Sequence, residues 1–167
     1  MSTTPLHQTA IEQGEALHFS DLPFCAQQSL VQTMAVEDGA WADDINRELL
    51  PFNGRPPSDD VWRTLIDQID KAQGDFLCFY SELPTEIVTK QLMDAHPAIR
   101  NDHNDWASYH QHYLATETIP DHARTSRWPC IATEGSSLAD GWKRLHCYVR
   151  ANDLTIPFVV LAPAHAP

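Results

Sequence analysis

The chain has 167 residues, of which 43% are hydrophobic and 20% are charged, and its formal net charge at pH 7 is -12. This length fits one domain of ordinary size, and no apolar run approaches the roughly 20 residues that a membrane-spanning helix needs. The composition therefore predicts a soluble chain with no membrane contact. Its acidity argues against broad non-specific adhesion to nucleic acid, which requires an extended basic surface.

The first 16 residues carry little hydrophobic periodicity, so we expect a loose lead-in there and a single domain over residues 17–162. No basic segment followed by an apolar one opens the chain, which predicts no secretion signal and a cytoplasmic location. The four cysteines, at positions 25, 78, 130 and 147, include no Cys-x-x-Cys pair. This spacing predicts reduced thiols and no metal site.

The elements of the first half begin with an extended segment that ends at Pro23 and a short helix over residues 25–36. Ser29 and Thr33 stand four residues apart, which places both hydroxyls on one face of that helix. A turn rich in proline then leads to Ser58, a good N-cap for a helix from Asp59 to about residue 72. A short buried strand is predicted near residues 76–80.

The second half is predicted to open with a helix over residues 84–96, bounded by two prolines. Another helix is expected over residues 104–115, a strand over 128–133, a turn over 134–137, a loop running into a helix over 138–151, and a final strand over 155–161. This order is typical of a mixed α+β domain. Helices predominate between about residues 40 and 122, which we interpret as a large helical insertion.

Charge is distributed unevenly, because residues 1–122 carry -14 whereas residues 123–167 carry +2. Lys143 and Arg144 follow the turn Asp140–Gly141 and stand in the first turn of a predicted helix, where cations oppose the helix dipole. A bound phosphate would favour this placement, since backbone N–H groups and a guanidinium can hold its oxygens together. A solvated helix start is the alternative, and the string alone favours it. If phosphate binds here, we expect Arg144 to be exposed, so that Arg144→Ala abolishes binding with little loss of stability.

The order of the C-terminal elements resembles the ParB/sulfiredoxin-like fold, in which a Gly-x-x-Arg box opens a helix and a short apolar strand follows. Residues 141–144 take the places of the box, and Ile156 and Pro157 those of the strand. Residues 22–34, "LPFCAQQSLVQTM", resemble the sulfiredoxin helix that supplies hydroxyls to nucleotide phosphates. The resemblance implies a single domain of this fold, with Ser29 and Thr33 as those hydroxyls.

One departure from sulfiredoxin is decisive for the chemistry that the resemblance implies. Trp142 occupies the position of the sulfiredoxin cysteine, and without that thiol sulfinic acid cannot be reduced. What remains implied is a phosphate-binding protein that acts on a nucleotide or DNA, like the DNase- or ATPase-type plasmid and phage effectors of this fold, including fertility-inhibition proteins. Mg²⁺ with ATP or CTP would be the cofactors.

The residues expected to carry such an activity fall into two groups. The catalytic candidates are Arg144, Lys143 and Asp140, and the phosphate-binding candidates are Gly141, Trp142, Ser29, Thr33 and Arg127. Glu134 is a further carboxylate that could hold Mg²⁺ beside the basic loop. Two interpretations of Trp142 stay open, because an indole here could stack on a base or fill the space of the missing cysteine.

Two other hypotheses are compatible with the sequence. His103, His110 and His112 could hold a metal, although their spacing matches no ligand motif and is more typical of a solvated polar face. The acidic body could instead belong to a non-enzymatic adaptor or inhibitor that docks on a basic protein partner through surface carboxylates. Whether the chain is an enzyme stays open at this point.

Overall fold

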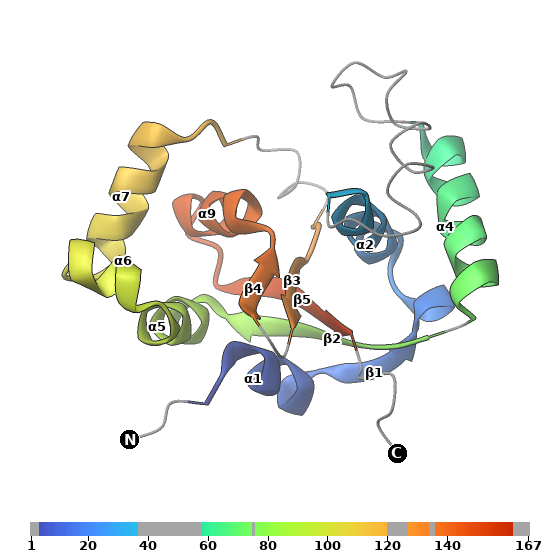
Figure 1. The fold of residues 1–167 in the computed structure, drawn as a ribbon, viewed down its shortest axis with the longest axis horizontal. Helices are drawn as coiled ribbons and strands as arrows, with labels where there is room; N and C mark the ends of the chain where they lie inside the picture. Colours follow the sequence, from blue (N-terminus) through green and yellow to red (C-terminus); the bar gives the residue numbers. More distant parts are fainter. Residues whose placement is uncertain (1–3, 37–57, 75, 120–126, 134–135, 162–167) are drawn as a thin grey trace.

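The computed structural model describes residues 4–36, 58–74, 76–119, 127–133 and 136–161 (Figure 1). The elements of its first half are α1 (Leu6–Gln13), β1 (Glu15–His18), the short 3-10 helix η1 (Phe19–Asp21), α2 (Phe24–Val36), α4 (Asp59–Gln73), β2 (Leu77–Pro84) and α5 (Thr85–Ala95). Those of its second half are α6 (Pro97–Asp102), α7 (Trp106–Thr116), β3 (Cys130–Thr133), β4 (Ser136–Asp140), α9 (Trp142–Arg150) and β5 (Thr155–Leu161). The predicted α+β class is confirmed.

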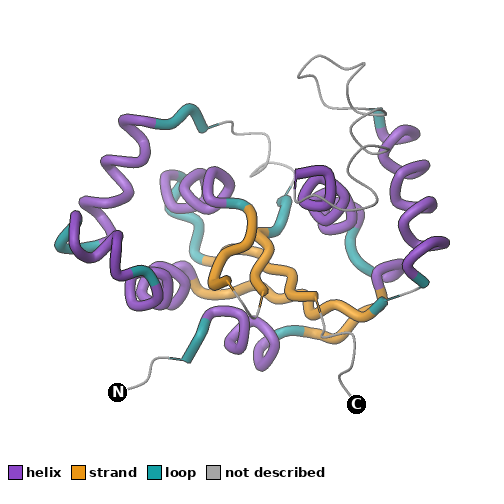
Figure 2. The backbone as a smooth tube through the Cα atoms, in the orientation of Figure 1, coloured by secondary structure: helices purple, strands orange, loops and turns teal. Residues whose placement is uncertain are grey.

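The five described strands form one sheet in the order β1-β2-β5-β3-β4 (Figure 2). β5 lies in the middle, antiparallel to β2 and parallel to β3, and the two outer pairs are antiparallel. The chain passes from β3 to β5 through β4 and α9. As a result, the predicted Gly-x-x-Arg box lies between the last two strands of the chain.

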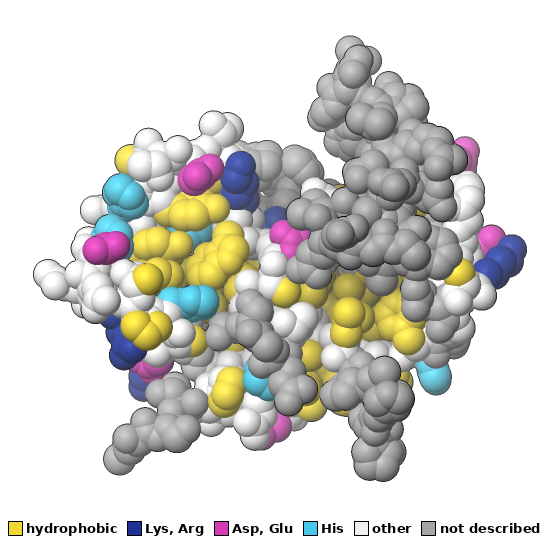
Figure 3. Space-filling model, in the orientation of Figure 1, with side chains coloured by type: hydrophobic (Ala, Val, Ile, Leu, Met, Phe, Trp, Pro, Cys, Tyr) yellow, Lys and Arg dark blue, Asp and Glu magenta, His cyan; other side chains and the backbone are white. Residues whose placement is uncertain are grey.

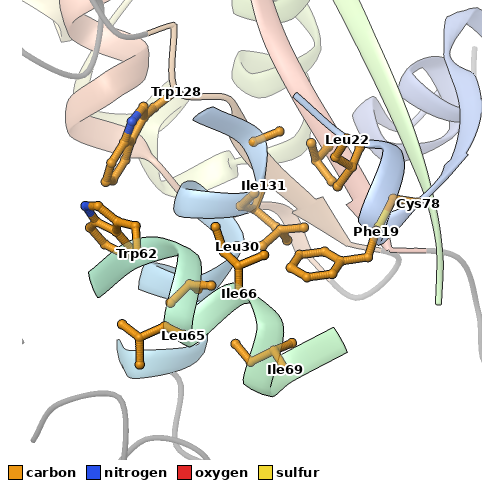
Figure 4. Close-up of a cluster of buried hydrophobic side chains, with 13 residues drawn as sticks. Phe19, Leu22, Leu30, Trp62, Leu65, Ile66, Ile69, Cys78, Trp128 and Ile131 are labelled. Atoms are coloured by element: carbon orange, nitrogen blue, oxygen red, sulfur yellow. The ribbon is translucent and has the colours of Figure 1, made fainter. Parts of the chain in front are cut away.

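Alternate residues of the central strands face opposite sides of the sheet, as the two-residue period of a strand requires. Ile131 and Val159 are register partners, and both belong to the buried cluster built with α2 and α4, including Leu30 and Trp62 (Figure 4). Their neighbours Cys130, Phe158 and Val160 belong to a second cluster, which contains Leu6 and Ala10 of α1. Both faces of the sheet are therefore covered, as expected of a sheet with apolar central strands.

Three helices, α2, α4 and α5, begin and end within one residue of their predicted bounds, whereas α6 was not predicted. In α4 the predicted stripe is buried, since Trp62, Leu65 and Ile69 are at most 4% exposed. Ser58 takes the extended N-cap conformation, and Gly74 ends the helix with φ at +63°. Pro84 precedes α5, and Pro97 stands at the start of the following helix.

Two expectations are wrong. The segment predicted to be a loose lead-in forms α1, whose Leu6 and Ala10 are 1% and 0% exposed because they pack against the sheet. Residues 136–140, predicted to end a turn and begin a loop, form β4, which pairs with β3, while residues 134–135 of the predicted turn lie outside the described residues. Its serines and its Asp-Gly pair are typical of turns, and backbone pairing overrides that preference.

The predicted helical insertion is described only in part, because residues 40–57, 75 and 120–122 lie outside the described residues. Inside the described part, β2 pairs with both β1 and β5, so this stretch also supplies a strand to the main sheet. Among the described residues, no helix has the length and apolar character needed to cross a membrane.

Candidate functional site

The candidate site forms where α2 meets the first turn of α9. The guanidinium of Arg144 donates a hydrogen bond through Nη1 to the hydroxyl of Ser29, and a second, 2.8 Å long, to the carbonyl oxygen of Pro129. Ser29 Oγ in turn donates to the same carbonyl at 2.8 Å. Ser29 of α2 and Arg144 of α9 therefore donate to the same carbonyl oxygen, that of Pro129, the residue before β3.

Asp140, the last residue of β4, links the same two helices. Its Oδ2 accepts a hydrogen bond from Thr33 Oγ1 at 2.8 Å and lies 3.0 Å from Arg144 Nη2, while its Oδ1 accepts from the backbone N–H of Gly141 at 2.7 Å. The structure thus brings together Ser29, Thr33, Asp140, Gly141 and Arg144. Both carboxylate oxygens are engaged in this network, which leaves Asp140 poorly placed to act as a general base.

Arg144 is buried, contrary to the expectation of an exposed side chain. The residue is 8% exposed, and its charge is paired with that of Asp140, whose side chain is 29% exposed. A buried arginine is tolerated only when it is paired and hydrogen-bonded, and here it has three acceptor groups around it. Its position therefore favours a role in holding α2, β3 and α9 together.

Gly141 gives the box its shape. Its backbone adopts φ +107° and ψ 20°, and the first α9 hydrogen bond runs from the N–H of Leu145 to the Gly141 carbonyl at 2.7 Å. A Cβ at this position would lie 3.1 Å from the Cα of Cys130. Only glycine permits both the left-handed backbone and this close approach to β3.

Lys143 and Trp142 lie at the edge of the network. The Lys143 side chain is 54% exposed, and its Nζ lies 3.7 Å from Glu117 Oε2, an exposed pair of the kind that contributes about 0 to 1 kcal/mol. Trp142 packs edge-on against His96, with ring centroids 5.3 Å apart, and against Tyr109 at 6.5 Å. These contacts favour the packing role for Trp142 over the stacking role.

Arg127 belongs to a different group of side chains. It pairs with Glu82 at 2.6 Å and with Asp153 at 4.0 Å, and its guanidinium lies 5.2 Å from the ring centroid of Tyr148. The structure therefore gives Arg127 its own carboxylate partners at the far end of α9. Glu134, the further carboxylate candidate, lies outside the described residues.

The cysteines are placed for packing. Cys78, Cys130 and Cys147 are buried, and burial raises the pKa of the Cys130 thiol to about 12, although the nearby Arg144 lowers it. Cys25 is partly exposed, and burial raises the pKa of its thiol as well. A thiol must ionise to act as a nucleophile, so the raised pKa values disfavour thiol chemistry at Cys25 and Cys130, and burial restricts access to Cys78 and Cys147.

We expect the purified protein to fail to reduce an oxidised peroxiredoxin. Alkylation under native conditions should modify no cysteine other than Cys25, which intact-mass spectrometry checks, because the other three side chains are buried. Rapid labelling of Cys130 or Cys147, or recovery of peroxiredoxin activity, would contradict this prediction.

The histidines of the second half are arranged differently from the predicted polar face. His110 Nδ1 lies 2.7 Å from Nδ1 of His146, a buried residue of α9 that the sequence analysis did not single out. His103 contacts His112 instead, with ring centroids 5.2 Å apart. In the part of the chain that the structure describes, no three His, Cys, Asp or Glu side chains are grouped to hold a metal.

Comparison of the chain with models of known protein families, with curated proteins and with solved structures gave no match. The resemblance to the ParB/sulfiredoxin-like fold accordingly stays a prediction from the residues of the box and of α2.

Proposed function

We propose that the chain has the ParB/sulfiredoxin-like fold and binds the phosphate group of a nucleotide or of a DNA backbone at the N-terminal end of α9. The observation behind this is the contact between Arg144 and Ser29, which joins the box to the hydroxyl face of α2 across 115 positions of the sequence. The two segments that carry the resemblance therefore meet in space, which supports the fold and the site together.

The chemistry of the site suits an anion. Gly141 is the N-cap of α9, and the first N–H groups of a helix point outward with the positive end of its dipole. Lys143 stands in this first turn with its side chain more than half exposed, and its contact with Glu117 is long and easily exchanged. A phosphate oxygen would be a stronger partner for the ammonium group than this carboxylate.

The residues of the site would have two roles, phosphate contact and positioning. Lys143 and the N–H groups of the α9 turn would contact the phosphate, whereas Arg144, Ser29, Thr33 and Asp140 would hold that turn in place. Hydrolysis or DNA cleavage assisted by Mg²⁺ would additionally require a general base, and the occupied oxygens of Asp140 do not supply one. We therefore propose binding of ATP, CTP or DNA as the primary activity. Nucleotide hydrolysis and DNA cleavage are to be assayed with the same variants.

We expect Lys143→Gln to weaken phosphate binding about tenfold or more, because a hydrogen bond to a charged group contributes about 1.5 to 3 kcal/mol. Calorimetric titration with ATP, CTP and a short DNA duplex measures this effect. Lys71→Gln is the matched control, since Lys71 is also exposed and paired with a carboxylate, Asp67, at 2.8 Å. Thermal unfolding of both variants should stay close to that of the unchanged protein.

The outcomes separate the two functional hypotheses. Equal loss of binding in Lys143→Gln and Lys71→Gln would indicate a general charge effect and would contradict a site at α9. Absence of heat with all three ligands would favour the acidic adaptor, for which a basic protein partner is the ligand to test. Metal-dependent DNA cleavage that is lost in Lys143→Gln would extend the proposal to catalysis.

A further inference from the structure

α7 is held against α9 by a pair of histidines inside an aromatic cluster. His110 of α7 and His146 of α9 approach to 2.7 Å between their Nδ1 atoms, and their rings lie nearly parallel with centroids 5.0 Å apart. His146 is fully buried, whereas His110 is partly exposed. The two nitrogens are close enough for one hydrogen bond, in which one ring donates and the other accepts.

The rest of the cluster also comes from α7. The ring of His146 stacks on Tyr113 at 3.8 Å and on Trp106 at 5.3 Å, and it contacts the edge of Tyr109 at 5.3 Å. No residue of α7 is buried, so the helix lies at the surface, where it packs against α9 and α5. Figure 3 shows the resulting apolar surface, with histidine beside it, over α7 and α9.

The geometry of the pair limits how many protons it can hold. Between the two Nδ1 atoms there is room for one hydrogen, and a second would place two N–H groups head to head. The other nitrogen of His146, Nε2, is buried and has no hydrogen-bond partner. A doubly protonated pair would therefore combine two like charges with an unsatisfied buried donor, whereas histidines separated in water carry both protons freely.

Burial and one nearby positive charge also oppose protonation of the pair. Burial lowers the pKa of the His110 imidazole, and the positive charge of Arg150 in α9 lowers it further. Burial, with a smaller contribution from His110, lowers the pKa of His146 to about 3. The cluster adds Tyr109 and Tyr113, whose pKa values burial raises, so both stay neutral in acid. Glu117 and Lys143 pair at its edge.

We propose that protonation of the His110–His146 pair releases α7 from α9 in mildly acidic solution. Free histidine takes up its proton near pH ~6.5, and the docked pair takes up its protons at lower pH. The docked arrangement is therefore fully stable above this value and loses stability as the pH falls below it. For each proton that only the released state binds, the ratio of released to docked helix rises up to tenfold per pH unit.

Hydrogen–deuterium exchange of the full chain at pH 7.5 and pH 5.5 tests the proposal. Protection factors, which correct for the pH dependence of intrinsic exchange, should fall about tenfold or more for residues 106–116. Residues 155–161 of β5 serve as the internal reference, because they should keep their protection. Unchanged protection of residues 106–116, or an equal loss in β5, would overturn the proposal, since the latter would indicate acid unfolding of the whole domain.

Three variants identify the titrating groups. His146→Phe keeps a ring between Tyr113 and Trp106 but cannot take up a proton, so α7 should stay protected at both pH values. His110→Gln removes the partner and should reduce the pH effect. His112→Gln, an exposed histidine on the same helix, is the control and should behave like the unchanged protein. A full pH effect in both His146→Phe and His110→Gln would overturn the proposal.

Discussion

Replacing Arg144 by alanine is expected to lower the free energy of unfolding by about 3 kcal/mol. Loss of one partner of a buried ion pair costs about 3 to 5 kcal/mol, and the lower end applies because the Asp140 side chain is 29% exposed and can be partly rehydrated. The substitution also deprives the Pro129 carbonyl and the Ser29 hydroxyl of a charged donor. The whole junction between α2 and α9 should therefore weaken.

Urea unfolding followed by circular dichroism measures this loss, with the melting temperature as a second readout. A domain of this size should melt roughly 6 to 12 °C lower for 3 kcal/mol. Lys143→Ala is the control, because the neighbouring lysine is exposed and should change stability by less than about 0.5 kcal/mol. Equal stability of Arg144→Ala and Lys143→Ala would contradict the structural role of Arg144.

The second large effect is expected for Gly141→Ala, at about 2 kcal/mol of lost stability. A residue with a Cβ is strained at φ +107°, and the new Cβ would lie 3.1 Å from the Cα and 3.2 Å from the Sγ of Cys130. Because the nearest atom belongs to the backbone of β3, rotation of a side chain cannot relieve the contact. The start of α9 must shift, and phosphate binding should weaken together with stability.

Gly74→Ala serves as a control that separates the backbone strain at positive φ from the steric contact with Cys130. Gly74 also has a positive φ, of +63°, but a Cβ there would meet nothing within 4 Å, so only the backbone preference is lost. We expect this control to cost about 1 kcal/mol, the lower end of the strain that a residue with a Cβ carries in a sparsely populated backbone region. If the two alanine variants unfold at the same urea concentration, the close approach of Gly141 to β3 has no energetic consequence and the described start of α9 is wrong.

Much of the fold could be predicted from the sequence because strong local signals coincide with the tertiary arrangement. The apolar runs predicted as strands near residues 76–80 and at 155–161 correspond to the paired strands β2 and β5, and α4 follows the predicted cap at Ser58 and ends at Gly74. The local signals were weak for α1, an eight-residue helix whose buried apolar stripe is mainly Leu6 and Ala10. β4 was missed because its residues are typical of turns, and its pairing with β3 is a tertiary feature.

The sequence predicted which residues form the network of the candidate site, but it did not predict the burial and ion pairing of Arg144. The resemblance to sulfiredoxin, rather than periodicity, led to Ser29 and Thr33, and the structure brings both to the box. The burial of Arg144 depends on where β4 ends, because that strand presents Asp140 to the guanidinium. The pairing of His110 with His146 joins residues 36 positions apart, and no local pattern in either segment indicates it.

The central claim is that a phosphate group binds at the start of α9, and nuclear magnetic resonance shift mapping tests it most directly. In a ¹⁵N-labelled sample titrated with ATP, CTP or a short DNA duplex, the largest amide shifts should fall on residues 141–145, with smaller ones on residues 29–33 of α2. Shifts concentrated elsewhere, for example around the cavity of about 320 Å³ lined by Phe19, Phe24 and Arg63, would contradict the claim. A complete absence of shifts would contradict it equally.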